Sequence, residues 1–521
     1  MIKRFISVFT RRSGTGNPTA VLAAVCLAAL ALPLGFSGGA LATPAIGREL
    51  GGGPAALNWV TNAFMLAFGS LLMAAGTCAD RYGRRRVFAL GVGGFAVCSL
   101  LLCAAPTLFV LDLLRALQGI AAAAALAGGT AALAQEYDGP GRTRAFSLLG
   151  TTFGLGLAFG PVLAGVLIEH LGWRAVFATG AVTTVPALAF GVPRMRESHD
   201  PGARTIDWPG IATFTGALSC FTYALIESAA LGWSSSLVRG LLAGSVVLAA
   251  AFWRVETRAV RPMLDLTLLR YRRFLGVQLL PVATCYGYIV LLVVLPLRLV
   301  GVDGFGAVAA GGMMVALSAP LLVVPMLAAL LTRWLAAGVI AGVGLALASA
   351  GLVWLAAAFR HGADAGLVAP LLAIGIGAGL PWGLMDGLSV SVVPKERAGM
   401  AAGVFSTARV AGECIALATV DAALTVLAHA RIAALDGAAV PAAAAWSAAA
   451  RLGGGDLAGA AALLPHVSRH ALLSSHAAAF DLLLHALAAV TLACACAVVL
   501  MLGRARADAD PSPSPAARAS L

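Results

Sequence analysis

Four of the charged residues that lie inside long apolar stretches of the sequence could take part in proton transfer, and a charge is unusual in such a stretch. They are Arg115, Asp386, Arg409 and Glu413. Placing an arginine at the centre of a membrane helix costs about 2.5–3.5 kcal/mol on insertion scales, so such a group must face a partner or a polar cavity. A carboxyl in the same setting can bind and release a proton. The four residues are therefore our candidates for proton coupling.

The spacing of these residues suggests which carboxyl carries the proton. Arg409 and Glu413 are four residues apart, so they share one helix face. An arginine favours the ionised form of a nearby carboxyl, so Glu413 is either a second proton carrier or simply the counter-ion of Arg409. Asp386 has no basic residue within a helical turn of its own segment. We predict that Asp386, ahead of Glu413, carries the proton, with Arg115 as a modulator. Two further acids are read as interfacial: Glu227 and Asp421.

The sequence contains no clear signature of a metal site or of an enzyme active site. His466 and His470 share a helix spacing, with His476 nearby, but no partnering acid completes a metalloprotease signature. The nine cysteines all lie inside or at the edges of apolar stretches, which argues against a disulfide framework. We expect no metal, no cofactor and no enzymatic activity.

A charged turn separates the second and third apolar stretches, where residues 76–90 read GTCADRYGRRRVFAL. A glycine permits a tight reversal there, and an aspartate at a helix end can accept N–H groups or pair with a guanidinium. The arginines alone would fit a plain cytoplasmic turn. The Gly-x-x-x-Asp-Arg-x-Gly-Arg-Arg order is more specific. Its residues are Gly76, Asp80, Arg81, Gly83, Arg84 and Arg85.

The fifth apolar stretch contains the pattern GLAFGPVLAG. Its residues of interest are Gly156, Gly160, Pro161 and Gly165. Glycines on one face let another helix approach closely, and proline removes one backbone hydrogen bond.

The composition places these motifs in a membrane. The 521 residues are 60% hydrophobic and 11% charged, whereas soluble domains carry about 25% charged residues. The net charge of +12 is spread between apolar stretches rather than clustered, so nucleic acid is not an expected partner. Each stretch is long enough for a spanning helix. The fourteen predicted spans are 19–42, 57–77, 87–105, 108–135, 145–169, 174–193, 209–229, 238–254, 274–299, 306–331, 335–358, 366–392, 399–425 and 478–502.

Arginine and lysine set the orientation, because they collect in cytoplasmic loops. The even-numbered spans are followed by basic clusters such as Arg84 to Arg86, and the opposite loops hold mostly single basic residues. Both termini are therefore predicted to be cytoplasmic. Residues 426–477 would lie outside the membrane on the far side, and residues 503–521 have the composition of a disordered tail.

Together these motifs resemble the major facilitator superfamily, in particular its fourteen-helix drug–proton antiporter branch, over nearly the whole chain. The turn at 76–90 matches the family's cytoplasmic gating motif, and the glycine pattern at 156–165 matches its antiporter motif. LDLLRALQG around Arg115 matches a further motif, for which the resemblance implies a role in proton transfer. Other matches are Trp59, Trp173-Arg174, Asp207-Trp208-Pro209-Gly210 and VPKERAGMAAGVFSTAR.

The resemblance implies an all-α integral membrane fold with two six-helix bundles and two linker helices. The predicted parts are a cytoplasmic segment (1–18), an N-terminal bundle (19–193), a linker with two helices (194–273), a C-terminal bundle (274–502) that includes the loop 426–477, and the tail (503–521).

One position departs from the family pattern. Members of this branch usually carry an acid in the first helix. Aligned on Pro44, this chain has Gly35 there. The usual proton route is therefore in doubt.

The leading hypothesis is a bacterial inner-membrane exporter that exchanges protons for small amphipathic or hydrophobic molecules by alternating access. A proton-independent facilitator, a specific metabolite exporter and a non-transporting membrane sensor remain alternatives. The expected partners are a small-molecule substrate, protons and the lipid bilayer. An accessory periplasmic protein of unknown identity is a further open partner.

Overall fold

The computed structural model describes residues 17–137, 139–199, 207–259, 268, 270–361, 365–393, 398–435 and 441–503. Within these residues, fourteen helical segments are long and apolar enough to cross a membrane, which confirms the predicted number. The segment before residue 17 and the tail after residue 503 lie outside the described residues, so the disordered tail stays a prediction.

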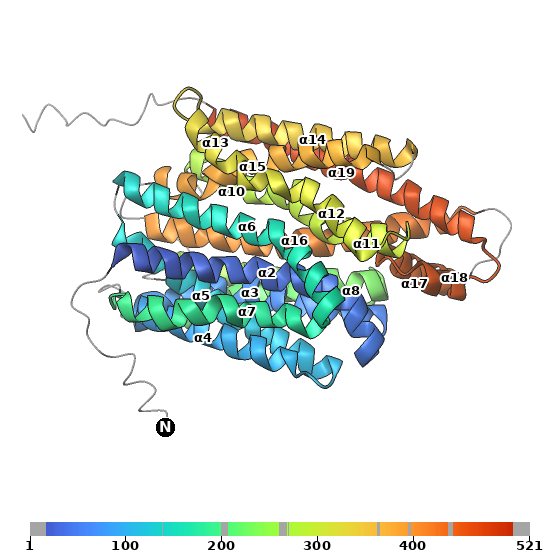
Figure 1. Cartoon of the computed structure of the whole chain (residues 1–521), viewed down its shortest axis with the longest axis horizontal. Coiled ribbons are helices and arrows are strands. Elements are labelled where there is room, and N and C mark those ends of the chain that lie inside the picture. Colours follow the sequence, from blue (N-terminus) through green and yellow to red (C-terminus); the bar gives the residue numbers. More distant parts are fainter. Residues whose placement is uncertain are drawn as a thin grey trace, which may run out of the picture.

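The helices run side by side along the long axis of the molecule in two groups (Figure 1). The N-terminal half is drawn in blue to teal, the C-terminal half in yellow to red, and α6, α12 and α16 lie along the boundary. The N-terminal half consists of α2 (Pro18–Leu50), α3 (Pro54–Tyr82), α4 (Arg84–Cys103), α5 (Leu108–Glu136), α6 (Gly139–Leu171), and α7 (Trp173–Pro186) with its short continuations η1 (Ala187–Gly191) and η2 (Val192–Arg194).

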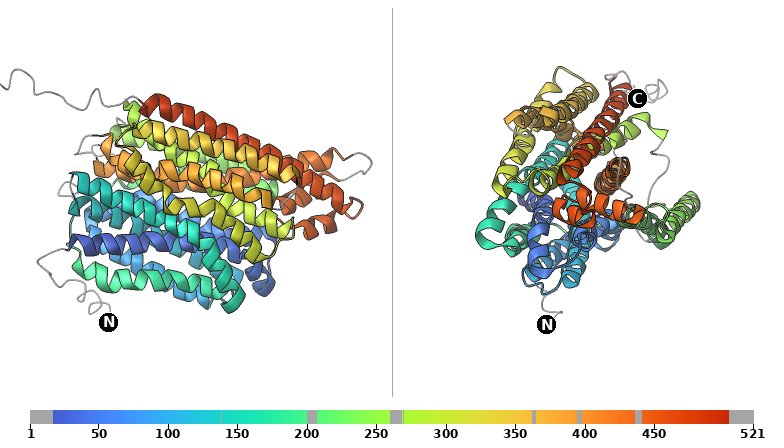
Figure 2. Two further views of the ribbon diagram at one scale, coloured as in Figure 1. Left: turned by 45° about the horizontal axis from the view of Figure 1, so that its top comes forward. Right: turned by 90° about the vertical axis from the view of Figure 1, so that its right-hand side faces the viewer.

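Two linker helices follow, α8 (Trp208–Leu231) and α9 (Ser236–Arg258), at the edge of the bundle in the end-on view of Figure 2. Asp207 starts α8 by accepting a hydrogen bond from the N–H of Gly210 at 2.8 Å, as an N-cap does. On the N-terminal half, α8 packs against α3. Thr215 Oγ1 donates to the Ser70 carbonyl at 3.1 Å.

The C-terminal half contains two interrupted spans. Its helices are α10 (Arg272–Thr284), η4 (Cys285–Ile289), α11 (Val290–Gly301), α12 (Ala307–Ser318), η5 (Ala319–Leu322), α13 (Val324–Leu331), α14 (Ala337–His361), η6 (Ala365–Leu367), α15 (Val368–Ser391), α16 (Ala398–Ala433) and α19 (Arg469–Leu502). The sequence predicts 274–299 and 306–331 as unbroken spans. Instead, a π-helical turn interrupts the first at η4 and a 3₁₀ turn interrupts the second at η5. Pro281 precedes the π turn and Pro320 lies in the 3₁₀ turn, and each lacks an N–H for the α-helical ladder.

The segment 426–477, which was predicted to lie outside the membrane, is largely helical in its described residues. It contains the end of α16, the short helices α17 (Ala442–Gly453) and α18 (Leu457–Leu463), and the start of α19. Alanine has the highest helix propensity, which accounts for helix in an alanine-rich stretch. Trp446 of α17 packs on His429 of α16, with ring centroids 5.1 Å apart. In Figure 1, α17 and α18 lie at the right-hand end of the bundle, and the start of α2 lies at the left-hand end.

Candidate functional site

An ion pair joins two helices of the C-terminal half. Arg409 of α16 donates from Nη1 to Asp386 of α15, at 3.0 Å from Oδ1 and 3.3 Å from Oδ2. Both side chains are buried. The ion-pair partner of Arg409 is therefore Asp386 rather than Glu413, the counter-ion that helix spacing suggested. Asp386 has no basic residue close to it along its own helix, as the sequence indicated, but it has one on the neighbouring helix. The guanidinium reaches across to the neighbouring helix, which a sequence pattern along one helix cannot show.

Glu413 lies one turn further along α16 and is only 3% exposed. Its Oε1 atom is buried without a hydrogen-bond partner among the described residues, and so is Nε of Arg409. The cluster of Asp386, Arg409 and Glu413 therefore contains two carboxyl groups and one guanidinium. We call it the buried triad.

The buried triad lies against the N-terminal half. The guanidinium carbon of Arg409 is 4.8 Å from the ring centroid of Phe153 on α6. Trp382, one turn before Asp386 on α15, donates from Nε1 to the carbonyl of Gly150 at 3.0 Å. A Cβ added to Gly150 would lie 3.3 Å from Cγ of Asp386. Nothing along the chain marks a contact between distant helices, so the sequence does not point to Gly150, Phe153 or Trp382.

Arg115 is buried in the N-terminal half, on α5. Its Nε donates to the Val60 carbonyl at 2.8 Å, and Nη1 donates to Oε1 of Gln118 at 2.6 Å. The guanidinium also stacks on Phe64, 4.4 Å from the ring centroid. Nη2 has no hydrogen-bond partner within the described part of the chain. Arg115 thus bonds to a carbonyl and an amide and lies over an aromatic ring, and the carboxyl of Asp112, one turn earlier on α5, also interacts with it electrostatically.

Gly35, the position of the usual helix-1 acid, packs inside the N-terminal half. A Cβ there would lie 3.4 Å from Cζ of Phe95. The site therefore offers no carboxyl at this position.

The glycines of the 156–165 pattern let α6 approach α2 closely. A Cβ on Gly156 would lie 2.8 Å from the Leu30 carbonyl oxygen, and one on Gly160 would lie 3.2 Å from Cβ of Ser37. Gly165 is looser, 3.8 Å from Leu41. Pro161 lies within α6. The predicted close approach is confirmed, and its partner is the first span.

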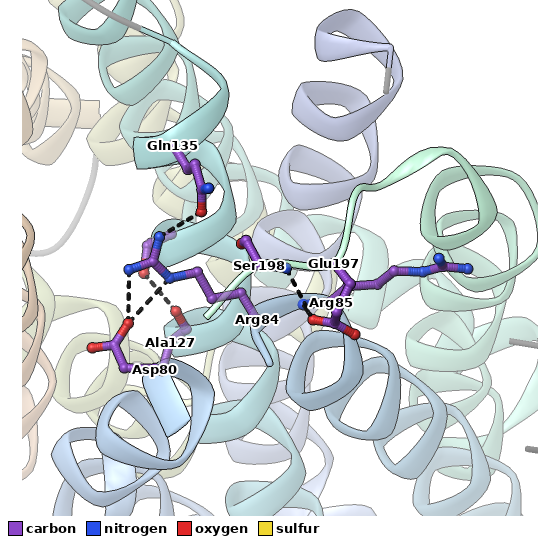
Figure 3. A network of polar contacts seen from close by, with 8 residues as sticks. Asp80, Arg84, Arg85, Ala127, Gln135, Glu197 and Ser198 are labelled. Carbon is purple, nitrogen blue, oxygen red and sulfur yellow. Dashed lines mark hydrogen bonds and ion pairs between the residues drawn. The ribbon is translucent and has the colours of Figure 1, made fainter. Parts of the chain in front are cut away.

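The charged turn joins α3 to α4 (Figure 3). Asp80 accepts from Arg84, at 3.1 Å from Nε and 2.9 Å from Nη2, and Arg84 also donates to Oε1 of Gln135 on α5 at 2.7 Å. Gly83 has φ +111°, which favours glycine. The side chain of Arg85 is buried, and Arg81 lies over the ring of Tyr82 at 5.7 Å. Open space adjoins Gly76, since a Cβ there would meet no atom within 4 Å.

Metal binding finds no support in the described residues, where no group of three or more histidine, cysteine and acidic side chains is placed to hold an ion. His476 instead stacks on Phe480, with ring centroids 5.8 Å apart.

Comparison with known proteins places these features in one family. A sequence profile described as the Major Facilitator Superfamily matches residues 24–417. A tetracenomycin C resistance and export protein from Streptomyces glaucescens is 30% identical over 404 residues, which cover 76% of this chain and 74% of that protein. The cephamycin export protein CmcT from Amycolatopsis lactamdurans is 31% identical over 422 residues, covering 78% and 85%.

Solved structures agree on the fold. The POT family transporter PepTSo superposes with a TM-score of 0.57 at 14% identity, covering 93% of this chain and 98% of that one. The human organic anion transporter MFSD10 gives a TM-score of 0.53 at 16% identity, covering 92% and 98%. These likenesses concern the fold alone. Because the family profile spans more than half of the chain, this multi-pass membrane protein belongs to the major facilitator superfamily, whose members are transporters rather than enzymes.

Proposed function

We propose that this chain exports small amphipathic or hydrophobic, drug-like molecules across the cytoplasmic membrane of a bacterium in exchange for protons. Two relatives that cover most of the chain are named as exporters of tetracenomycin C and of cephamycin, and this supports the direction and class of transport. The observation that carries the proton coupling is the buried triad, with one cation for two carboxyl groups.

The charge imbalance of the triad assigns the roles. Burying an unpaired carboxylate costs far more than burying its neutral acid form. Asp386 has the guanidinium of Arg409 as its partner, whereas Oε1 of Glu413 has no partner in the described residues. We therefore assign the proton to Glu413 in this state, which reverses the order expected from the sequence.

A partner exchange follows from this assignment. When Glu413 releases its proton, its carboxylate competes with Asp386 for Arg409, which lies one turn away on the same helix. Moving the guanidinium toward Glu413 would loosen Asp386, which lies against Gly150 of the other half. Proton release and the contact between the halves are coupled in this way, as alternating access requires. Arg115 holds α5 against α3 within the N-terminal half, and the turn at Asp80 and Arg84 acts as the cytoplasmic gate.

The experiment uses everted vesicles, a pH-sensitive dye and a panel of candidate compounds. We expect Glu413→Gln to abolish substrate-driven proton movement while substrate counterflow, which needs no net proton transfer, continues. Asp386→Asn frees Arg409 to pair with Glu413 and should impair both. If Glu413→Gln kept full proton-coupled efflux and Asp386→Asn lost it, Asp386 would be the proton carrier, as the sequence predicted. Full coupling in both variants would mean that neither carboxyl carries the proton.

A second candidate is a proton-independent facilitator or a specific metabolite exporter. The observation in its favour is Gly35, packed against Phe95 where relatives of this branch usually carry an acid. In that case wild-type vesicles would transport a panel compound without any dye signal. A non-transporting sensor would transport none of the compounds.

The orientation belongs to the same proposal, with both termini in the cytoplasm. Ser447 of α17 and Tyr82 at the end of α3 are both exposed. In a cysteine-free background, an impermeant maleimide added to intact cells should label Ser447→Cys and spare Tyr82→Cys. The reverse pattern would overturn the orientation. An accessory periplasmic partner remains a prediction.

A further inference from the structure

The first turn of α4 has no cap of its own. The residue before it is Gly83, which has no side chain to accept the N–H groups of the following residues. A helix start leaves such N–H groups unsatisfied unless another group supplies an acceptor. In most helices a serine, threonine, aspartate or asparagine at the N-cap position does so.

The missing acceptors come from the segment that follows η2, 112 residues further along the chain. Oε1 of Glu197 accepts from the backbone N–H of Arg85 at 3.2 Å, and the carbonyl of Ser198 accepts from the N–H of Arg84 at 2.9 Å. Oε2 of Glu197 lies 3.4 Å from Nε of Arg86. Figure 3 shows Glu197 and Ser198 on one side of the turn and Gln135 on the other. The carboxylate also lies at the positive end of the helix dipole.

This contact explains why position 83 is a glycine. A Cβ there would lie 2.7 Å from the carboxyl carbon of Glu197, so a side chain at position 83 and the carboxylate of Glu197 compete for the same space. The positive φ of Gly83 is a separate requirement, set by the reversal of the chain.

The segment that carries Glu197 is itself anchored. Met195 is buried, and the Arg194 carbonyl accepts from the N–H of Asn17 at the start of α2, at 3.4 Å. Glu197 also lines a cavity of about 180 Å³ together with Gln135, Glu136 and Ser198. Shortening its side chain therefore opens onto an existing polar cavity instead of creating a dry void.

We propose that Glu197 is a positioning residue of the cytoplasmic gate. It caps α4 from a distance, fixes the turn that presents Asp80 and Arg84, and ties the end of the sixth span to the start of the third. The gate motif thus extends beyond the contiguous residues 76–90. This inference rests on the proposed gating role of that turn.

The test is a double-mutant cycle between positions 83 and 197, with transport and membrane abundance both measured. Glu197→Ala removes the acceptor that caps α4. We expect this variant to transport about ten-fold more slowly than the wild type, at near-normal abundance in the membrane. Glu197→Gln should keep most activity, because its amide oxygen still accepts the Arg85 N–H. Gly83→Ala should be severe in the wild type and less severe in the Glu197→Ala background, where the space is free and only the strain of the positive φ remains. Glu136→Ala, which removes another acid beside the same cavity, is the matched control and should leave transport unchanged.

A reporter at Gly76 separates this inference from the proposed function. The open space there accepts Gly76→Cys, whose alkylation from the cytoplasmic side in everted vesicles measures the position of the gate without requiring transport. Glu197→Ala should change the alkylation rate and Glu136→Ala should not. The inference would be overturned if Glu197→Ala kept the wild-type alkylation rate and the wild-type transport rate. It would also be overturned if the transport loss of the double variant equalled the product of the losses of Gly83→Ala and Glu197→Ala. If the wild type transports no panel compound, the alkylation result still decides the role of Glu197.

Discussion

Arg115 is buried within a span of the N-terminal half and Arg409 within a span of the C-terminal half, which also buries Arg298. Arg115 and Arg409 are held differently. Arg115 bonds to a backbone carbonyl and to Gln118, both neutral, and stacks on Phe64 of its own half. Arg409 bonds to the carboxylate of Asp386 and stacks on Phe153 of the other half. Arg115 therefore lies inside one bundle, whereas Arg409 lies where the two halves meet, which is the surface that rearranges in the proposed alternating-access mechanism.

Under the proposed function, this difference indicates which arginine lies at the site that responds to proton binding. The guanidinium of Arg115 hydrogen-bonds only to neutral groups, and the carboxyl of Asp112, one turn earlier on α5, interacts with it electrostatically. A guanidinium between two carboxyls can change partners, and its helix also touches the opposite half. The comparison teaches that burial and charge alone do not identify a coupling residue. The contact with the opposite half, through Phe153, is what distinguishes Arg409 from Arg115.

The largest effect is expected from Arg409→Leu. It leaves two buried carboxyls without a cation, and breaking a buried pair costs about 3–5 kcal/mol. Transport should be lost and membrane abundance should fall. Adding Asp386→Asn should restore abundance, because the uncompensated charge is removed, without restoring transport. Quantitative blotting and vesicle uptake measure both. Wild-type transport by Arg409→Leu would contradict the proposed role of Arg409 in transport.

Arg115→Leu should lower the free energy of unfolding by less than Arg409→Leu does. It leaves the Val60 carbonyl and the Gln118 amide without one partner each, and such neutral groups cost about 1–3 kcal/mol when left unsatisfied. We expect reduced transport with an unchanged proton-to-substrate ratio. Thermal unfolding of the purified proteins ranks the two arginines. A greater loss of stability in Arg115→Leu than in Arg409→Leu would contradict the ranking.

The sequence predicted features that are contiguous along the chain. The fourteen spans follow from composition, and the turn at Asp80 and the α6 glycines follow from local order. Each depends on neighbours within a few residues. The number of spans and the close packing of Gly156 are confirmed, because hydropathy and small size act locally.

The contacts between distant segments could not be predicted in this way. The choice of Asp386 by Arg409 depends on how α15 and α16 face each other, and helix spacing alone favoured Glu413. The role of Glu197 likewise depends on a return of the chain after six spans. The π turn at η4 follows a proline that the span prediction had ignored, since hydropathy does not register a missing N–H.

A matched pair of glycines sharpens the comparison further. Gly150→Ala places a methyl group against Asp386, and Gly39→Ala places one 3.1 Å from Nη2 of Arg115. The first disturbs an ion pair at the boundary between the halves, and the second presses on an arginine inside one half. We expect Gly150→Ala to lower proton-coupled uptake several-fold and Gly39→Ala to lower it less. Equal losses in the same vesicle assay would mean that the two arginines are equally sensitive.

The smallest effect is expected from Ser99→Ala, at the outer edge of the Arg115 network. Ser99 Oγ accepts from Nε2 of Gln118 at 2.8 Å, but Gln118 still accepts from Arg115 through its other amide atom. Arg115 therefore keeps its position, and the loss is that of one neutral hydrogen bond, about 1 kcal/mol. Ser349→Ala is the control, because Ser349 is also buried and donates to the Ala488 carbonyl at 2.8 Å in the other half. Both variants should unfold at slightly lower temperature and transport at nearly the wild-type rate. If Ser99→Ala abolished transport while Ser349→Ala did not, the Arg115 network would take part in transport. The view that Arg115 only holds its own half together would then be wrong.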